Sequence, residues 1–300
     1  MLERRTDGTL VQRRGARGAA PLLREIDAVG GTSQLNHVTI FPNEVPGFAF
    51  MCRGCPWDYS SAETDYSKVK AIEVATGPGG LQNPAAGVPT PPGGLGPNPF
   101  TVTAIQFYED ALAAGHKIAA VGSSDNHKGG VKTDPVTTAP IGQATTVVRA
   151  HELSESAVTC AVEAGHTFVK VWGSDRPDLR LEGRIPGVDK TAIFGDTVVS
   201  PTVTFTARVL DAAPIDGQPF QLLILKNGVV SQIVPVDGSS KTVEFAATGP
   251  GRYGLRLMRG SSIEAVSTPI WVRAGEDARI VTDTCKDERA RKKTRAFRRR

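Results

Sequence analysis

Apolar residues recur along the first half of the chain at two spacings, one typical of helices and the other of strands. Apolar residues at helical spacing, each run followed by a glycine, predict three helices, at residues 21–29, 103–114 and 153–164. Short apolar runs predict four strands, at residues 32–35, 70–75, 117–121 and 167–172. Helices that alternate with strands in this way predict a parallel sheet with helices outside it.

The pattern changes after about residue 179. Short runs of alternating apolar and polar residues follow, separated by Gly and Pro, at residues 202–209, 220–228, 241–248, 252–260 and 267–273. Asn227-Gly228, inside the second run, is a hairpin turn signal. Several short strands at this spacing predict a small antiparallel β-sandwich.

These patterns divide the 300 residues into four parts. We expect a basic N-terminal segment, a part that alternates helices and strands, a β-sandwich and a basic tail, at residues 1–20, 21–175, 176–275 and 276–300. The boundary between the two folded parts falls in SDRPD, residues 174–178. A Pro/Gly-rich stretch at residues 77–99 predicts a long loop within the first of them.

Positive charge is concentrated at the C-terminus. The net charge is +4, yet residues 286–300 alone carry nine Lys and Arg against two acidic residues, which leaves about −3 for the rest. A basic stretch with a single aromatic residue, Phe297, favours a solvated tail; the alternative is an anchor for nucleic acid. No apolar run approaches the roughly 18 residues of a membrane span, and no apolar segment follows the basic N-terminus as in a signal peptide.

The four cysteines do not form a recognisable framework. Cys52 and Cys55 form a single CxxC, which indicates either a local disulfide or two free thiols. A structural zinc site normally needs four ligands, so one such pair is weak evidence for zinc.

Residues that could bind a metal ion lie at or near the ends of the first predicted strands. Asp125 and His127 follow the strand at 117–121, His37 follows the strand at 32–35, and Glu73 lies in the strand at 70–75. In parallel sheets, ligands bind at the carboxyl ends of the strands. The spacing of Asp125 and His127 lets a carboxylate and an imidazole face one cavity, which predicts a metal site. The alternative is an Asx-turn with an exposed histidine.

The other histidines carry no predicted role in chemistry. His116 and His166 each follow a helix-ending Ala-Gly and precede a strand, at the end of the sheet opposite to the candidate site. Their position indicates a contribution to stability. His151 lies where a helix begins and is expected on its surface.

Three stretches together resemble a known superfamily. GGTSQLNHVTIFP, KAIEVATG and AAGHKIAAVGSSDNHKGG resemble the later part of the PHP (polymerase and histidinol phosphatase) domain, a metal-dependent hydrolase on a distorted β/α barrel. The continuation, through LSESAVTCAVEAGHTFVKV to STPIWV, is similar to the carbaryl-hydrolase-like branch of metallohydrolases. The resemblance covers roughly residues 20–273 and implies a partial, truncated barrel followed by the β-sandwich.

The resemblance implies a hydrolase of phosphoester or related ester bonds in small molecules. Asp125 and His127 match the last ligand motif of the superfamily, His37 matches an earlier ligand, and Glu73 matches a position near the site. The implied metals are divalent, and mixed nitrogen and oxygen ligands suit Zn²⁺, Mn²⁺ or Fe²⁺ alike. Such metals activate a water molecule for attack on the ester, and Asp125 is also a candidate to take a proton from that water.

The chain departs from the superfamily at its start, because no His-x-His motif precedes His37. We therefore expect a truncated N-terminus, and activity that depends on the missing ligands. A cytoplasmic and a secreted location both stay open, and no oligomeric state is indicated. The alternative function is that of a catalytically inactive or fragmentary PHP-like protein, which binds partners through its β-sandwich.

Overall fold

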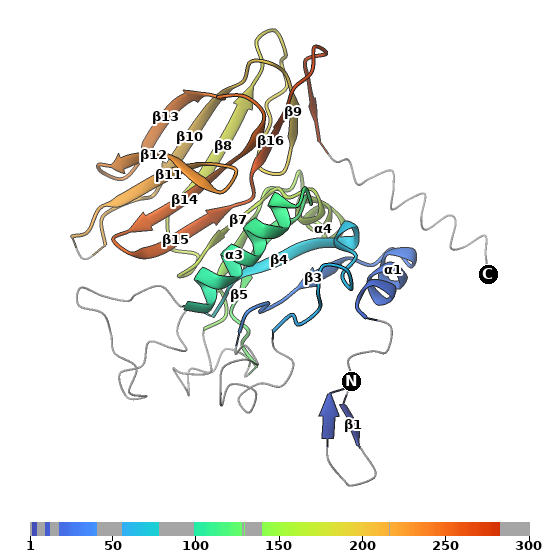
Figure 1. Ribbon diagram of the computed structural model, residues 1–300. Helices are drawn as coiled ribbons and strands as arrows, with labels where there is room; N and C mark the ends of the chain where they lie inside the picture. The colour runs from blue at the N-terminus through green and yellow to red at the C-terminus, as the bar shows by residue number, and fades with distance from the viewer. Residues whose placement is uncertain are drawn as a thin grey trace.

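Strands dominate the structure. The computed structural model describes residues 2–4, 10–12, 18–40, 56–77, 99–127, 129, 140–215 and 217–282. In these residues the helices are α1 (Ala20–Ala28), η1 (Tyr66–Lys68, a 3-10 helix), α3 (Pro99–Ala113) and α4 (Glu155–Glu163). The same residues form seventeen strands in four sheets, beside three α-helices. The strands make up most of the folded part in Figure 1. No helix in the described ranges is both long and apolar enough to cross a lipid bilayer.

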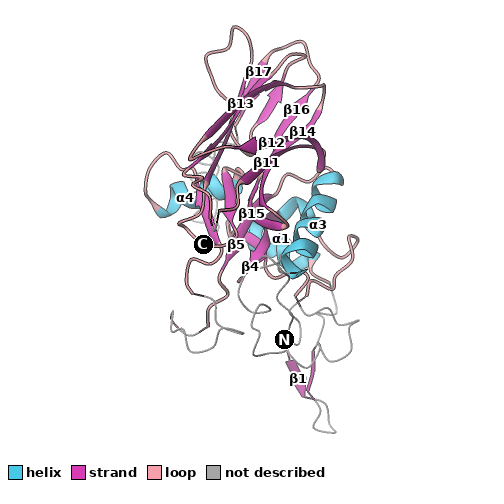
Figure 2. Cartoon of the chain, turned by 90° about the vertical axis from the view of Figure 1, so that its left-hand side faces the viewer, coloured by secondary structure: helices cyan, strands magenta, loops and turns pink. Residues whose placement is uncertain are grey.

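A small parallel sheet positions the candidate site. It consists of β3 (Ser33–Leu35), β4 (Val69–Thr76) and β5 (Ala119–Ser123), in that order, and both pairs run parallel. The helices α1 and α3 cover one face of this sheet and α4 covers the other (Figure 2). The central strand β4 is therefore buried along almost its whole length, which explains why most of its residues are apolar.

Two further sheets face each other across the main apolar core. The smaller one has the order β13-β10-β8, formed by β8 (Asp178–Arg184), β10 (Thr204–Leu210) and β13 (Lys241–Ala246). The larger one has nine strands: β6 (Thr145–Val148), β7 (Thr167–Lys170), β9 (Thr197–Val199), β11 (Phe220–Lys226), β12 (Val229–Val236), β14 (Gly251–Arg259), β15 (Ser262–Ser267), β16 (Ile270–Arg273) and β17 (Arg279–Val281). Phe205, Leu222 and Leu255 are fully buried between them.

The expected fold class, a partial β/α barrel of PHP type followed by a small antiparallel β-sandwich, is wrong. Among the described residues none of the sheets closes, and the all-parallel sheet has only three strands. The strand β7, which the pattern places next in the parallel series, instead pairs antiparallel with β6 and β15. The large sheet is also mixed rather than purely antiparallel, because β9 and β16 run parallel.

Threonine hydroxyls from other segments form hydrogen bonds with the backbone of β5 on the side away from β4. These bonds explain why no fourth parallel strand pairs with β5. The Gly122 amide donates to Thr146 Oγ1 at 2.8 Å, and Thr167 Oγ1 donates to the Ala120 carbonyl at 2.8 Å. The Ala120 amide donates to Thr268 Oγ1 at 3.0 Å. These side chains satisfy backbone groups that a fourth parallel strand would otherwise pair, so β5 needs no further neighbour of its own kind.

The large sheet also includes β6 and β7, which precede the expected domain boundary at residues 174–178. The division of the chain into two folded domains stays a prediction. Within the N-terminal segment, β1 (Leu2–Arg4) and β2 (Leu10–Gln12) pair as an antiparallel hairpin. Cys160 on α4 is disulfide-bonded. Cys52, Cys55 and the basic residues 286–300 lie outside the described residues.

Candidate functional site

The predicted site residues lie at or near the carboxyl ends of the three strands of the parallel sheet. In the register, Leu35 of β3 lies beside Ile72 of β4, and Thr76 of β4 lies beside Ser123 of β5. His37 follows the end of β3 by two residues, and Asp125 follows the end of β5 by two. We call His37, Glu73, Ser123, Asp125 and His127 the strand-end site.

Glu73 joins the ends of all three strands. Its side chain is buried, with 1% of the residue exposed. Its Oε2 atom accepts hydrogen bonds from the His37 backbone amide at 2.6 Å and from Thr76 Oγ1 at 2.8 Å, and its Oε1 atom accepts one from Ser123 Oγ. Hydrogen bonds to an ionised group are stronger than those between neutral groups, so this carboxylate holds the turn after β3 against the end of β5.

These contacts limit what Glu73 offers to a metal ion. A carboxylate has about four lone-pair directions for hydrogen bonds or metal ligation. Three are taken by donors of the protein, which leaves one on Oε1. Glu73 therefore suits the role of a residue that positions the strand-end site better than that of a principal ligand.

Asp125 and His127 lie side by side beyond the end of β5. The distance between Asp125 Oδ1 and His127 Nε2 is 3.8 Å, and their side chains are 43% and 79% exposed. This distance is too long for a hydrogen bond. It is close to the roughly 3–4 Å that separates two ligand atoms which share one ion with bonds of about 2 Å. The separation of the two atoms is therefore within the range for two ligands of one ion.

The backbone of the strand-end site is strained at two positions. His37 has a φ of 36° and Asp125 a φ of 51°, in the left-handed region that side chains other than glycine rarely adopt. In the described residues, only two other non-glycine residues have a positive φ. Such strain concentrates at functional sites, where the surrounding structure maintains it. Here the bond from the His37 amide to Glu73 helps to maintain it.

The four predicted ligands do not form a single cluster. Among the described residues, no three His, Cys, Asp or Glu side chains are arranged to hold one metal ion. The structure therefore brings Asp125 and His127 together as a pair, with His37 and Glu73 at the neighbouring strand ends.

The other histidines have structural surroundings. His166 Nε2 lies 3.1 Å from Asp196 Oδ1, and both residues are largely buried. Asp196 Oδ2 also accepts a hydrogen bond from the Ile193 amide at 2.9 Å, so this pair stabilises a turn of the large sheet. The His116 ring stacks on Tyr66, with ring centroids 5.0 Å apart.

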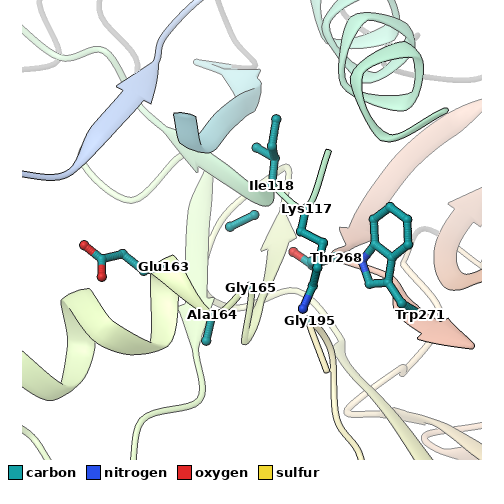
Figure 3. Close-up of a pocket in the computed structure, with 9 residues that line it drawn as sticks. Lys117, Ile118, Glu163, Ala164, Gly165, Gly195, Thr268 and Trp271 are labelled. Carbon is teal, nitrogen blue, oxygen red and sulfur yellow. The ribbon is translucent and has the colours of Figure 1, made fainter. Parts of the chain in front are cut away.

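A small pocket lies beside α4, where Lys117, Gly195 and Thr268 meet (Figure 3). Its volume is about 10 Å³, which is room for no more than one water molecule. The Glu163 side chain points away from it (Figure 3), and its Oε1 atom accepts a hydrogen bond from Thr32 Oγ1 at 2.5 Å. This pocket is therefore too small for a substrate.

A larger cavity, of about 320 Å³, lies between α3 and β14. Its lining includes four charged residues that have no role predicted from the sequence: Glu109, Asp110, Arg252 and Arg256. The signal was present in the strand sequence RYGLRLMRG, because residues 252 and 256 share one face of a strand. Arginine on a covered sheet face is unusual and indicates a pairing or binding role.

No protein family and no curated protein matches this chain. The resemblance to the PHP superfamily accordingly stays a prediction, and so do the hydrolase activity and the divalent metal that it implies.

Proposed function

We propose that this protein is a metal-dependent hydrolase of phosphoester or related ester bonds, with the strand-end site as its active site. Asp125 and His127 would hold a divalent cation. The observation that carries the proposal is their pairing at 3.8 Å on the same sheet edge as His37 and the buried Glu73. The resemblance to the PHP superfamily supports the same residues as ligands.

The ligand atoms limit which metals suit the site. One imidazole nitrogen and one carboxylate oxygen fit Zn²⁺, Mn²⁺ or Fe²⁺ without favouring any of them. When bound, such an ion lowers the pKa of a water molecule and polarises the ester oxygen.

The chain's own residues would orient this chemistry. Asp125 has a second carboxylate oxygen, so it is also the candidate general base for the attacking water. Glu73 fixes the position of His37 through the backbone amide of that residue. Ser123 Oγ donates its hydrogen bond to Glu73, and this contact holds the end of β5, from which Asp125 follows two residues later.

Elemental analysis of the purified full chain, after incubation with Zn²⁺, Mn²⁺ or Fe²⁺ and gel filtration, tests the proposal. We expect one of these metals to be retained near stoichiometrically, and to be lost in the double variant Asp125→Ala/His127→Ala. Both side chains are partly exposed, so the variant is expected to fold. Hydrolysis of p-nitrophenyl phosphate and p-nitrophenyl acetate is expected to follow the metal content.

The double variant His151→Ala/Glu152→Ala is the matched control. His151 Nε2 and Glu152 Oε1 form an exposed pair 3.6 Å apart after β6, away from the strand-end site. This control is expected to retain metal and activity. Metal retained by the Asp125/His127 variant would place the ion elsewhere. A folded native chain that binds none of the three metals would contradict the proposal and favour the inactive, partner-binding alternative.

A further inference from the structure

The larger cavity lies on the side of β14 that faces away from the core of the two sheets. Tyr253, Leu255 and Leu257 point into that core. Because neighbouring side chains of a strand point to opposite faces, Arg252 and Arg256 face α3 instead, and both line the cavity. We call this cavity the arginine pocket and define it by Ile105, Glu109, Val229, Arg252, Arg256 and Ile263. Its volume of about 320 Å³ suits a small molecule.

Arg252 already has partners within the protein. Its Nη2 atom lies 3.4 Å from Glu109 Oε2, and its guanidinium lies over the Trp271 ring at 5.8 Å from the ring centroid. Its side chain is 7% exposed and that of Glu109 18%. Burial raises the pKa of the Glu109 carboxyl, and the charges of Arg252 and Arg256 oppose that shift. Arg252 and Glu109 therefore largely neutralise each other.

Among the described residues, Arg256 forms no ion pair of this kind. Its Nε atom is buried without a hydrogen bond, and within the described residues its guanidinium forms no ion pair. Burial lowers the pKa of Arg256, opposed by the charge of Glu109. A buried donor on a charged group that lacks an acceptor costs free energy. The Arg256 side chain lines the cavity, so its guanidinium, which forms no ion pair among the described residues, indicates a ligand that carries a negative charge.

The remaining lining defines the ligand class. Ile105 and Ile263 are buried, Val229 is exposed, and all three contribute apolar surface to the lining. Asp110 adds a second negative charge beside Glu109, so the lining balances two cations with two anions. A ligand with two negative charges would meet repulsion, whereas a single carboxylate matches the planar guanidinium of Arg256.

We propose that the arginine pocket binds a small organic monocarboxylate, with the carboxylate on Arg256 and the hydrocarbon part against Ile105, Val229 and Ile263. Hexanoate and benzoate are the simplest probes of this class. None of these residues belongs to the strand-end site, so the inference is independent of the hydrolase proposal.

Isothermal titration calorimetry of the full chain with hexanoate, benzoate and inorganic phosphate tests this inference. We expect saturable binding of at least one carboxylate and markedly weaker binding of phosphate. Arg256→Met is expected to weaken carboxylate binding at least about tenfold, because a charged hydrogen-bond partner is lost. The unliganded variant is expected to melt at the same or a higher temperature, because methionine removes a partly buried charge whose Nε atom has no hydrogen-bond acceptor.

Two further variants test whether binding occurs in the arginine pocket: one changes an arginine outside the pocket, and the other obstructs the pocket. Arg208→Met, at a partly buried arginine of β10 outside the pocket, is expected to bind as the native chain does. Val229→Trp, at a residue 70% exposed beside the cavity, is expected to fold and to obstruct binding. Binding that survives both Arg256→Met and Val229→Trp would overturn the inference. So would phosphate binding as tight as that of the carboxylates, or no heat of carboxylate binding in the native chain.

Discussion

A single buried carboxylate organises the candidate site at the scale of the residue. Glu73 accepts hydrogen bonds from the His37 amide, Thr76 and Ser123, which belong to three different strand ends. The sequence predicted that Glu73 lies at the site, but the triple contact depends on parallel pairing of β3, β4 and β5. Periodicity specifies which face of a strand a residue occupies, not which donors from other strands reach it.

Glu73→Gln is expected to destabilise the protein by roughly 2–4 kcal/mol. The amide nitrogen of glutamine cannot accept a hydrogen bond, so at least one buried donor would lose its acceptor. Urea denaturation measures the change. Glu244→Gln, at an exposed position of β13, serves as the control and is expected to be nearly neutral. Equal stability of the two variants would mean that the Glu73 contacts contribute little.

The contact between β5 and β7 decides the architecture at the scale of the element. A Cβ atom added at Gly122 would lie 2.6 Å from Val169 Cγ1 and 3.1 Å from Ala144 Cβ. Only glycine allows β5 to approach the large sheet this closely. The strand at 167–172 was predicted as an element, but its partners were not. Its antiparallel pairing with β6 and β15 replaced the expected barrel.

Gly122→Ala is expected to destabilise the protein by roughly 1–3 kcal/mol, because the added methyl group overpacks this junction. Gly254→Ala on β14 is the matched control, since the nearest atom to its added Cβ would be Ser267 Oγ at 3.6 Å. Thermal or urea denaturation of both variants separates the steric effect from the general effect of alanine in a strand. A Gly122→Ala variant as stable as the Gly254→Ala variant would contradict the close packing.

At the scale of the whole molecule, one apolar cluster spans the expected domain boundary. It contains Leu35 and Ile72 of the parallel sheet together with Val169, Trp172 and Ile263. Trp172 Nε1 donates to Ser262 Oγ and to the Ile263 carbonyl, both at 3.0 Å. Residues on the two sides of the boundary at 174–178 are thus packed together, as parts of one folding unit are.

We expect a fragment of residues 1–175 to lack a stable fold. In this fragment β7 would lose its pairing with β15, and Trp172 would lose its hydrogen bond to the Ile263 carbonyl. Tryptophan fluorescence and circular dichroism of the fragment, beside the full chain, measure this. An emission maximum shifted to longer wavelength and a broad melting transition are expected. A fragment that melts cooperatively with native-like fluorescence would instead support independent domains.

The sequence by itself determined most of the elements and the residues that end the parallel strands. Both are local properties: periodicity over a few residues and the residue types at strand ends. Only the tertiary structure decided how strands pair across the chain, and with it the open sheets, the Glu73 contacts and the arginine pocket. The reason is physical, because strand pairing depends on which edges meet, and here threonine hydroxyls and one glycine at β5 end the parallel series.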